Sequence, residues 1–267
     1  MSSPSAMSKP HQAKLNDELI DCSICGDLGG VLRLLSQGAN PCISWSTPLR
    51  EAVKNNHVGC AKALAPLSAD QGGCDVALLL AATNGFSECL QALIPFSNPM
   101  AEGSRALSEA IIEGHAKCAE LLIPVSNMRE DGLNALALAA GHGQSECVKL
   151  LIGHCDPKAD RSYPLRMAIA NARAECVDIL IPASIPLIDD LQLAACALDR
   201  GNAEIFGIML RHEPRLATTL NFPKIQSAAR GNGFHNLADF LGSLLDAREL
   251  SSSTPHSQPE LVHKRRL

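Results

Sequence analysis

The feature that most constrains this chain is a period of 29 residues. Cysteine, alanine, leucine, glycine and proline each recur at this step, and the series keep a common register. They are Cys60, Cys89, Cys118, Cys147 and Cys176; Ala52, Ala81, Ala110, Ala139, Ala168 and Ala197; Leu49, Leu78, Leu107, Leu136 and Leu165; Gly85, Gly114, Gly143 and Gly201; and Pro66, Pro95, Pro124 and Pro182. Several independent series in register indicate a repeat array, in which each unit stacks on its neighbours.

Each unit has the pattern of two short helices joined by a turn. In LSEAIIEGHAKCAELLIP (residues 107–124), apolar residues recur at i, i+3 and i+4 on both sides of Gly114. Glycine suits a helix end where the chain turns back sharply. Pro124 predicts that the second helix ends at about Ile123, because proline cannot continue a helix. Ala110 is small enough to let the two helices approach closely. The unit is therefore a helical hairpin that cannot bury its apolar faces alone.

Three segments carry a resemblance to a known family. DGLNALALAAGHGQSECVKLLI (131–152) and STPLREAVKNNHVGCAKAL (46–64) resemble ankyrin repeats, and GDLGGVLRLLSQGANP (26–41) resembles the opening unit of such an array. The resemblance covers residues 14–248, as about eight units. It implies an all-α fold, a curved solenoid of helix-turn-helix units from which turns or β-hairpins project at right angles. It also implies a surface that grips other proteins.

Two departures from the family pattern change the expectation. Ankyrin units have about 33 residues, whereas most units here have 29. Because the missing residues fall after the second helix, we expect shortened loops in place of long β-hairpins. The TPLH signature of the family is also eroded, since its histidine position is Arg50, Leu79, Ser108, Ala137 and Arg166 in successive units. Without the hydrogen bonds of that histidine, stability should depend more on packing.

The ends of the chain differ from the repeats. The step from Gly201 to Gly233 is 32 residues, and Ile205 and Leu237 replace the cysteine, as expected of a terminal cap. The polar, proline-containing segment SSSTPHSQPELVHKRRL follows. We expect three parts: a disordered segment at 1–13, an ankyrin repeat domain at 14–248 and a disordered tail at 249–267.

Composition narrows the class of partner and the compartment. A net charge of −5 argues against nucleic acid, and an aromatic content of 3% favours packed helices over sheets. No apolar run approaches the length that spans a bilayer, and the start MSSPSAMSKP lacks the apolar stretch of a secretory signal. An odd count of 11 cysteines fits reduced thiols. These features predict a cytoplasmic protein that does not bind membranes, expected to be a monomer.

The cysteine series has a simple interpretation. Neighbouring packed helices lie about 8–10 Å apart, whereas a disulfide needs Cα atoms within about 4.4–6.8 Å. Equivalent cysteines of neighbouring repeats therefore cannot form a disulfide bond. A row of them also does not converge on one metal ion. We interpret Cys118 and its equivalents as small buried apolar residues.

Two further arrangements of cysteine have to be weighed. Cys22 and Cys25 form a CxxC, with Cys42 as a conceivable third metal ligand, but Cys22 also occupies a core position of its unit. The sequence allows either a metal site or core packing for Cys22 and Cys25, and we prefer core packing. His57 and His115 each precede a cysteine by three residues, but a catalytic dyad would need an orienting group that the sequence does not place.

Function is then expected to come from a surface. No phosphate-binding loop, HExxH or GxSxG motif is present, so we predict no enzyme activity, no cofactor and no metal. The leading hypothesis is an interaction module, a scaffold or adaptor, that grips an unidentified partner protein with the concave face of its first helices and the adjoining loops. The expected contact residues are Trp45, Arg50, Lys54, Asn55, Asn84, Arg105, Glu113, Arg129, His142, Asn171 and Arg200.

Trp45 is the preferred anchor because it is the only tryptophan, lies in a predicted loop and has a side chain typical of interface hot spots. An alternative hypothesis is a bacterial effector that acts on a host protein, with the first ten residues as an export leader. An enzyme hidden in the last unit is disfavoured, since few residues lie outside the repeats.

Overall fold

The computed structural model describes residues 9–68, 72–187 and 191–253, and over these residues the chain is helical without any strand. The helices form two compact units, unit 1 (Met1–Ile185) and unit 2 (Pro186–Leu267). The expected all-α repeat fold with shortened loops is confirmed.

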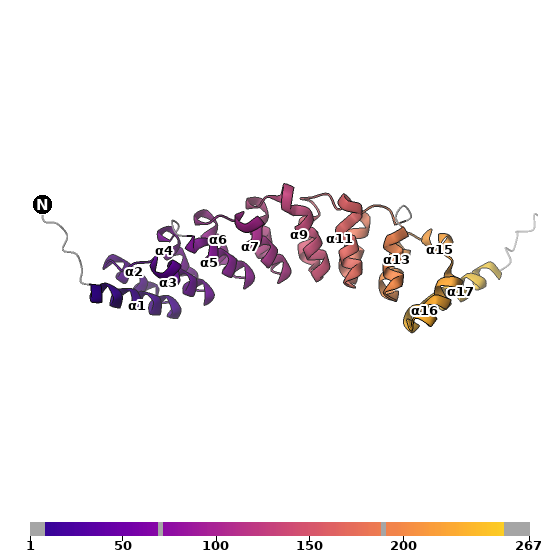
Figure 1. Cartoon of the computed structure of the whole chain (residues 1–267), viewed down its shortest axis with the longest axis horizontal. Coiled ribbons are helices and arrows are strands. Elements are labelled where there is room, and N and C mark those ends of the chain that lie inside the picture. Colours follow the sequence, from indigo (N-terminus) through magenta and orange to yellow (C-terminus); the bar gives the residue numbers. More distant parts are fainter. Residues whose placement is uncertain (1–8, 69–71, 188–190, 254–267) are drawn as a thin grey trace, which may run out of the picture. The chain divides into compact units, whose positions relative to one another are not determined.

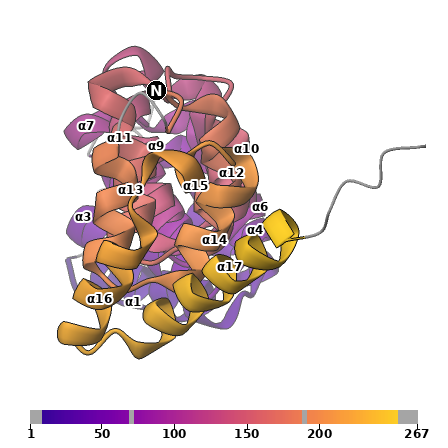
Figure 2. The same cartoon turned by 90° about the vertical axis from the view of Figure 1, so that its right-hand side faces the viewer.

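Unit 1 is built of helix pairs. The first helices of its pairs are α1 (Lys9–Cys25), α3 (Ile43–Lys54), α5 (Gly73–Thr83), α7 (Ala101–Ile112), α9 (Met128–His142) and α11 (Ala159–Ala170). The second helices are α2 (Leu28–Ser36), α4 (Val58–Leu64), α6 (Ser87–Leu93), α8 (Ala116–Leu122), α10 (Ser145–Leu151) and α12 (Ala174–Leu180). Successive pairs stack along the unit in chain order (Figure 1). Each first helix packs on the next first helix and each second helix on the next second helix. Seen along the stack, α3, α7 and α11 lie in one layer and α4, α10 and α12 in the other (Figure 2).

The core lies where the repeated small and apolar residues meet. Cys60, Cys89, Cys118, Cys147 and Cys176 are at most 1% exposed. The alanine row from Ala52 to Ala168 is 0% exposed at every step, and so is the leucine row Leu64, Leu93, Leu122, Leu151 and Leu180 at the ends of the second helices. Alanine lets the helices of a pair approach, and leucine fills the space that remains. The interpretation of Cys118 as a residue that fills space is confirmed.

Short 3₁₀ helices stand where longer ankyrin units carry hairpins. They are η1 (Ala65–Leu67), η3 (Ile94–Phe96), η4 (Ile123–Val125) and η5 (Ile181–Ala183), and each contains the periodic proline. The serine after three of them closes the second helix: the hydroxyls of Ser97, Ser126 and Ser184 each donate to a leucine carbonyl at 2.8 Å. The second helix α8 ends at Leu122, one residue before the predicted end at Ile123.

A left-handed turn lies within the first residues of the first helix in alternate repeats. Ser44, Trp45 and Ser46 have φ values of 48°, 62° and 56°, and Asp160, Arg161 and Ser162 have 47°, 53° and 55°. Glu102 and Ser104 repeat the feature between them. Pro48 and Pro164 then start the regular helix, where a proline costs no hydrogen bond. L-residues rarely adopt such a run, at a cost of about 1–2 kcal/mol each.

Unit 2 contains the last two helix pairs. They are α13 (Leu191–Asp199) with α14 (Ala203–His212), and α16 (Phe222–Gly231) with α17 (His235–Ser253). Together with the pairs of unit 1 they make the expected eight pairs over the residues that the structure describes. The rings of Phe206 and Phe222 meet edge to face, with centroids 6.0 Å apart.

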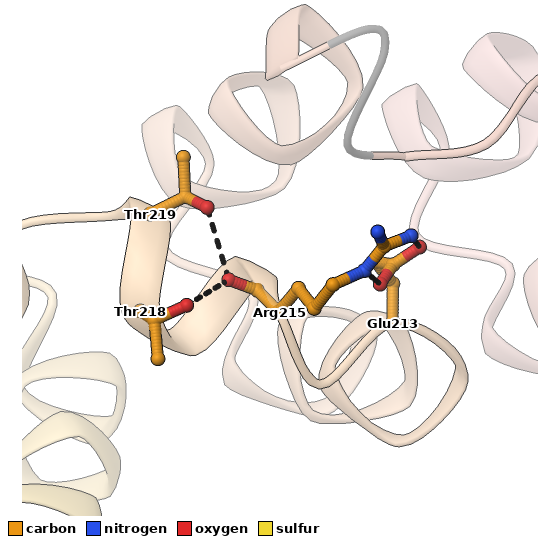
Figure 3. A network of polar contacts seen from close by, with 4 residues as sticks. All are labelled: Glu213, Arg215, Thr218 and Thr219. Carbon is orange, nitrogen blue, oxygen red and sulfur yellow. Dashed lines mark hydrogen bonds and ion pairs between the residues drawn. The ribbon is translucent and has the colours of Figure 1, made fainter.

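A short helix, α15 (Leu216–Thr219), accounts for the longer step between the last two pairs. Glu213 and Arg215 pair just before it, with Nε to Oε1 at 2.8 Å. The hydroxyls of Thr218 and Thr219 donate to the carbonyl of Arg215 (Figure 3). These contacts close a compact turn that the 29-residue units lack.

The helices extend beyond the expected limits of 14 and 248. α1 begins at Lys9, and α17 continues to Ser253. The remainder of the segments expected to be disordered, residues 1–8 and 254–267, lies outside the described residues. No helix in the described ranges combines the length and apolar character needed to cross a membrane.

Candidate functional site

One face of the stack in unit 1 is the outer side of its first helices, called here the first-helix face. One row along it is Thr47, Val76, Arg105, Asn134 and Tyr163, which occupy the same position in successive repeats. The buried leucine two residues further on is kept in every repeat, from Leu49 to Leu165. The outer position therefore changes chemistry at each step while the core stays the same.

Six of the sequence-predicted residues form another row, at the ends of the first helices: Asn55, Asn84, Glu113, His142, Asn171 and Arg200. All six are exposed. The amides of Asn55, Asn84 and Asn171 donate to carbonyls one turn back in their own helices, at 2.8–2.9 Å. The side-chain N–H groups of these asparagines therefore cap the C-terminal ends of their helices. The side-chain carbonyl oxygen of each can accept a hydrogen bond from a partner. Arg200 belongs to unit 2.

Trp45 lies in a left-handed turn with 70% of its surface exposed. Arg50 supports this turn, because its Nη2 donates to the carbonyl of Ser44 at 3.4 Å and to the hydroxyl of Thr47 at 3.1 Å. Lys54 pairs with Glu51 at 3.6 Å. The structure thus places Trp45 outside and gives Arg50 a supporting position behind it.

The other two predicted arginines are exposed but lie apart. Arg105 is on α7, held by Glu102 at 2.9 Å and Glu109 at 3.8 Å, and these carboxylates raise the pKa of its guanidinium. Arg129 is in the first turn of α9. Neither residue joins the helix-end row.

Sequence reasoning missed three exposed apolar side chains in the repeats around Trp45, which lie at the end of η1, in the first turn of α5 and just before α7. Leu67 is 49% exposed, Val76 39% and Met100 55%. Two hydrogen bonds join neighbouring segments here: the Cys42 thiol donates to the Leu67 carbonyl at 3.0 Å, and the backbone N–H of Asn98 donates to Asp75 Oδ1 at 2.6 Å. We call Trp45, Leu67, Val76 and Met100 the apolar loop edge. Loop lengths alone did not reveal it, because an isolated exposed apolar residue carries no signal.

A groove between α9 and α11 brings two predicted residues together. His142 and Asn171 line it with residues that were not predicted, and its volume is about 410 Å³. The full lining is Asn134, Ala137, Leu138, Gly141, His142, Tyr163, Met167, Asn171 and Arg173. The available signal was the coincidence of Ala137 and Gly141, small residues at two positions where other repeats carry larger ones.

Side chains at the start of the second helices join neighbouring repeats. The imidazole Nε2 of His57 and His115 lies 2.9 and 3.0 Å from carbonyls one repeat back. Gln144 Nε2 donates to the Ile112 carbonyl at 2.9 Å, and Arg173 Nε to the Gly141 carbonyl at 3.2 Å. The expectation that packing would have to replace the lost histidine hydrogen bonds is therefore incomplete, since a different row of side chains bonds the repeats.

Glycine in the preceding turn makes room for these side chains. Gly114 has φ 78°, and a Cβ built on it would lie 2.4 Å from Gln144 Oε1. His57 and His115 are thus occupied with the backbone of the previous repeat. Burial also raises the pKa of the Cys118 thiol, opposite to the lowered pKa of a reactive cysteine.

The CxxC does not gather ligands. Cys22 is half-buried, and its Sγ lies 4.0 Å from Asp27 Oδ2. Cys25 is exposed, so the preferred core-packing interpretation is wrong for this residue. Its position at the last residue of α1, past the packed turn of the helix, explains the difference. Within the described ranges no group of three or more His, Cys, Asp or Glu side chains could hold a metal ion.

Comparisons with known proteins agree with this architecture. The family model described as ankyrin repeats (3 copies) matches residues 49–129 and 123–190, which together span more than half of the chain. The crystal structure of the human ASB11 ankyrin repeat domain resembles this fold with a TM-score of 0.56 and 23% identity, over 73% of this chain and 97% of that one. No curated protein sequence matches the chain. The chain belongs to the ankyrin repeat family.

Proposed function

We propose that this chain is a non-catalytic scaffold or adaptor that holds a partner protein against the first-helix face and the apolar loop edge of unit 1. Ankyrin repeats indicate a protein–protein interaction module. The observation that carries the proposal is the exposure of Trp45, at 70%, together with that of three other apolar side chains, Leu67, Val76 and Met100, in the same repeat and the next two. Exposed apolar clusters with an aromatic residue are typical of sites that another protein covers.

The remaining sequence-predicted residues of unit 1 form the polar surroundings of this proposed surface. Arg105 and the unit 1 members of the helix-end row give it mixed charge, with Glu113 between Asn84 and His142. Polar rims of this kind fix register, while the apolar anchor supplies most of the affinity. We further propose a monomer in the cytoplasm, a compartment that 11 cysteines, an odd number, support.

The test compares affinity capture by four versions of the full chain from an extract of cells that express it. Trp45→Ala and Met100→Ser remove two members of the loop edge. Leu32→Ser is the matched control, since Leu32 is 53% exposed but lies on α2, in the second-helix layer. A protein retained by the native chain and by Leu32→Ser, but lost from the loop-edge variants, supports the proposal.

Equal capture of every specific protein by all four versions contradicts the proposed surface. Capture should be followed by titration of the purified partner, where loss of one hot-spot aromatic is expected to weaken binding by about 2 kcal/mol or more. The hypothesis of an exported effector rests on the first ten residues, of which 1–8 lie outside the described residues. An effector would bind its partner through the same surface, but the partner would be a protein of the host cell.

A further inference from the structure

We infer that the groove between α9 and α11 is a specificity pocket for an acidic peptide segment of the partner. One aliphatic side chain of the peptide enters the groove, and a neighbouring carboxylate of the peptide binds Arg173. This inference rests on the proposed function and adds the chemistry of the partner to it. It concerns a place on the first-helix face separate from the apolar loop edge.

The floor of the groove exists because this one repeat carries two small residues. Ala137 occupies the position held by Arg50, Leu79, Ser108 and Arg166 in other repeats. Gly141 likewise stands where those repeats have Lys54, Thr83, Ile112 and Ala170. Ala137 is 3% exposed, and both residues are buried beneath the opening. Each of those repeats has at least one larger side chain at these two positions, whereas α9 has a small residue at both.

The walls of the groove suit an aliphatic side chain. Leu138 contributes from α9, and Tyr163 and Met167 contribute from successive turns of α11. Methionine adapts to irregular shapes and is common at surfaces that bind apolar groups. A volume of about 410 Å³ lies within the range of sites that enclose a ligand group, about 300–1,000 Å³.

The rim of the groove selects for negative charge. Arg173 uses Nε on the carbonyl of Gly141 at 3.2 Å, and its terminal amino groups have no partner among the residues that the structure describes. No carboxylate lines the groove. The nearby Asp160 is already engaged by Arg166 at 3.4 Å. A carboxylate on the partner would therefore meet a guanidinium with free donors, the geometry in which charged hydrogen bonds are strongest.

The position of the groove favours a peptide over a compact small molecule. Asn134, Ala137 and Tyr163 stand 58 residues after Val76, Leu79 and Arg105, so they belong to the same rows of the first-helix face. Val76, Leu79 and Arg105 line a smaller hollow between α5 and α7. An extended segment can thus enter the groove and continue along the face, with side chains meeting successive repeats.

The test selects random short peptides displayed on phage against the full chain, followed by anisotropy titration of the enriched peptides. Gly141→Leu fills the groove. Gly153→Leu is its matched control, because a Cβ at Gly153, just after α10, would meet nothing within 4 Å. Arg173→Gln removes the charge and keeps an inter-repeat hydrogen bond, since Gln144 makes the equivalent bond one repeat earlier. Arg33→Gln, on α2, controls for the loss of a charge.

Enriched peptides should contain Asp or Glu next to Leu, Ile, Val or Met. Gly141→Leu and Arg173→Gln should each weaken binding about tenfold or more, with both controls within about twofold of the native chain. Replacement of the peptide carboxylate by its amide should mimic Arg173→Gln, which keeps the test decisive if Gly141→Leu does not fold.

Selection of no peptide, or of peptides without acidic residues, overturns the inference, as does unchanged binding by Gly141→Leu or Arg173→Gln. Occupation of the groove by small-molecule fragments but by no peptide also overturns it. In each case capture through the apolar loop edge can still succeed, so failure of the pocket is distinguishable from failure of the proposed function.

Discussion

At the scale of single residues, the cysteine row is a packing solution with a chemical consequence. A thiol is small, apolar and close in size to valine, and it fits between helices that alanine draws together. The same burial makes these thiols hard to ionise. It raises the pKa of Cys89, Cys147 and Cys176 to about 11.

Replacement of Cys118 tests the packing role. Cys118→Val should change the free energy of unfolding by less than about 1 kcal/mol, because shape and polarity are nearly kept. Cys118→Asp should cost several kcal/mol, roughly 3 or more, because a carboxylate is buried without a partner. Urea denaturation of both variants measures the difference. Similar losses for the two substitutions would argue that the thiol has a role beyond filling space.

The raised thiol pKa values predict a loss of stability in alkali. The folded state holds these protons up to a pKa of about 11, whereas the unfolded chain releases them from about 9.0. The stabilisation is therefore complete below pH 9 and falls as the pH rises from 9 to 11. Replacing Cys89, Cys147 and Cys176 together by valine should reduce this fall, measured as the urea midpoint at each pH. An identical pH profile for both proteins would contradict the assignment.

The side chains that bond neighbouring repeats can be tested at His115. His115→Ala should destabilise by about 1 kcal/mol, because the Thr83 carbonyl loses its 3.0 Å partner. His115→Gln should be close to native, since Gln144 makes the equivalent bond in the next repeat. Thermal unfolding followed by circular dichroism compares them. A glutamine variant as unstable as the alanine variant would show that the ring itself is required.

At the scale of elements, alternate first helices contain a left-handed turn near their start. Three residues with positive φ redirect the chain there before Pro48. The turn displays Trp45 at a conformational cost. Gly103 occupies the equivalent position two repeats after Trp45. Glycine adopts a positive φ without the steric cost that other residues have. Conformational strain at exposed side chains is common where function requires a fixed display.

Trp45→Gly should therefore raise stability while it removes the proposed anchor. The expected gain is about 0.5–1 kcal/mol, since glycine tolerates φ 62° and an exposed tryptophan contributes little packing. Trp45→Ala keeps the strain and serves as the control for loss of the side chain. Chemical denaturation of the three proteins gives the ranking. A glycine variant less stable than the alanine variant would mean that this turn is not strained.

At the scale of the whole molecule, a stack of equivalent pairs is stabilised by contacts between neighbours. Excision of residues 114–142, one period of 29, joins Glu113 to Gly143 and restores the register. The shortened chain should stay soluble and unfold cooperatively, as measured by circular dichroism. Excision of residues 114–133 breaks the register and is the control, expected to be insoluble. Aggregation of both chains would contradict the modular design.

The 29-residue register determined the fold by itself, because burial repeats at the same positions in every unit. It therefore placed the Cys118 row in the core, and it located Trp45 and the helix-end row on the outside. Tertiary structure alone decided which side chains meet across repeats. Arg173 reaches the backbone of Gly141 only because a second helix starts above the previous turn. The groove opens because Ala137 and Gly141 face Met167 of the next first helix, a juxtaposition set by packing distance, which the periodic sequence does not encode.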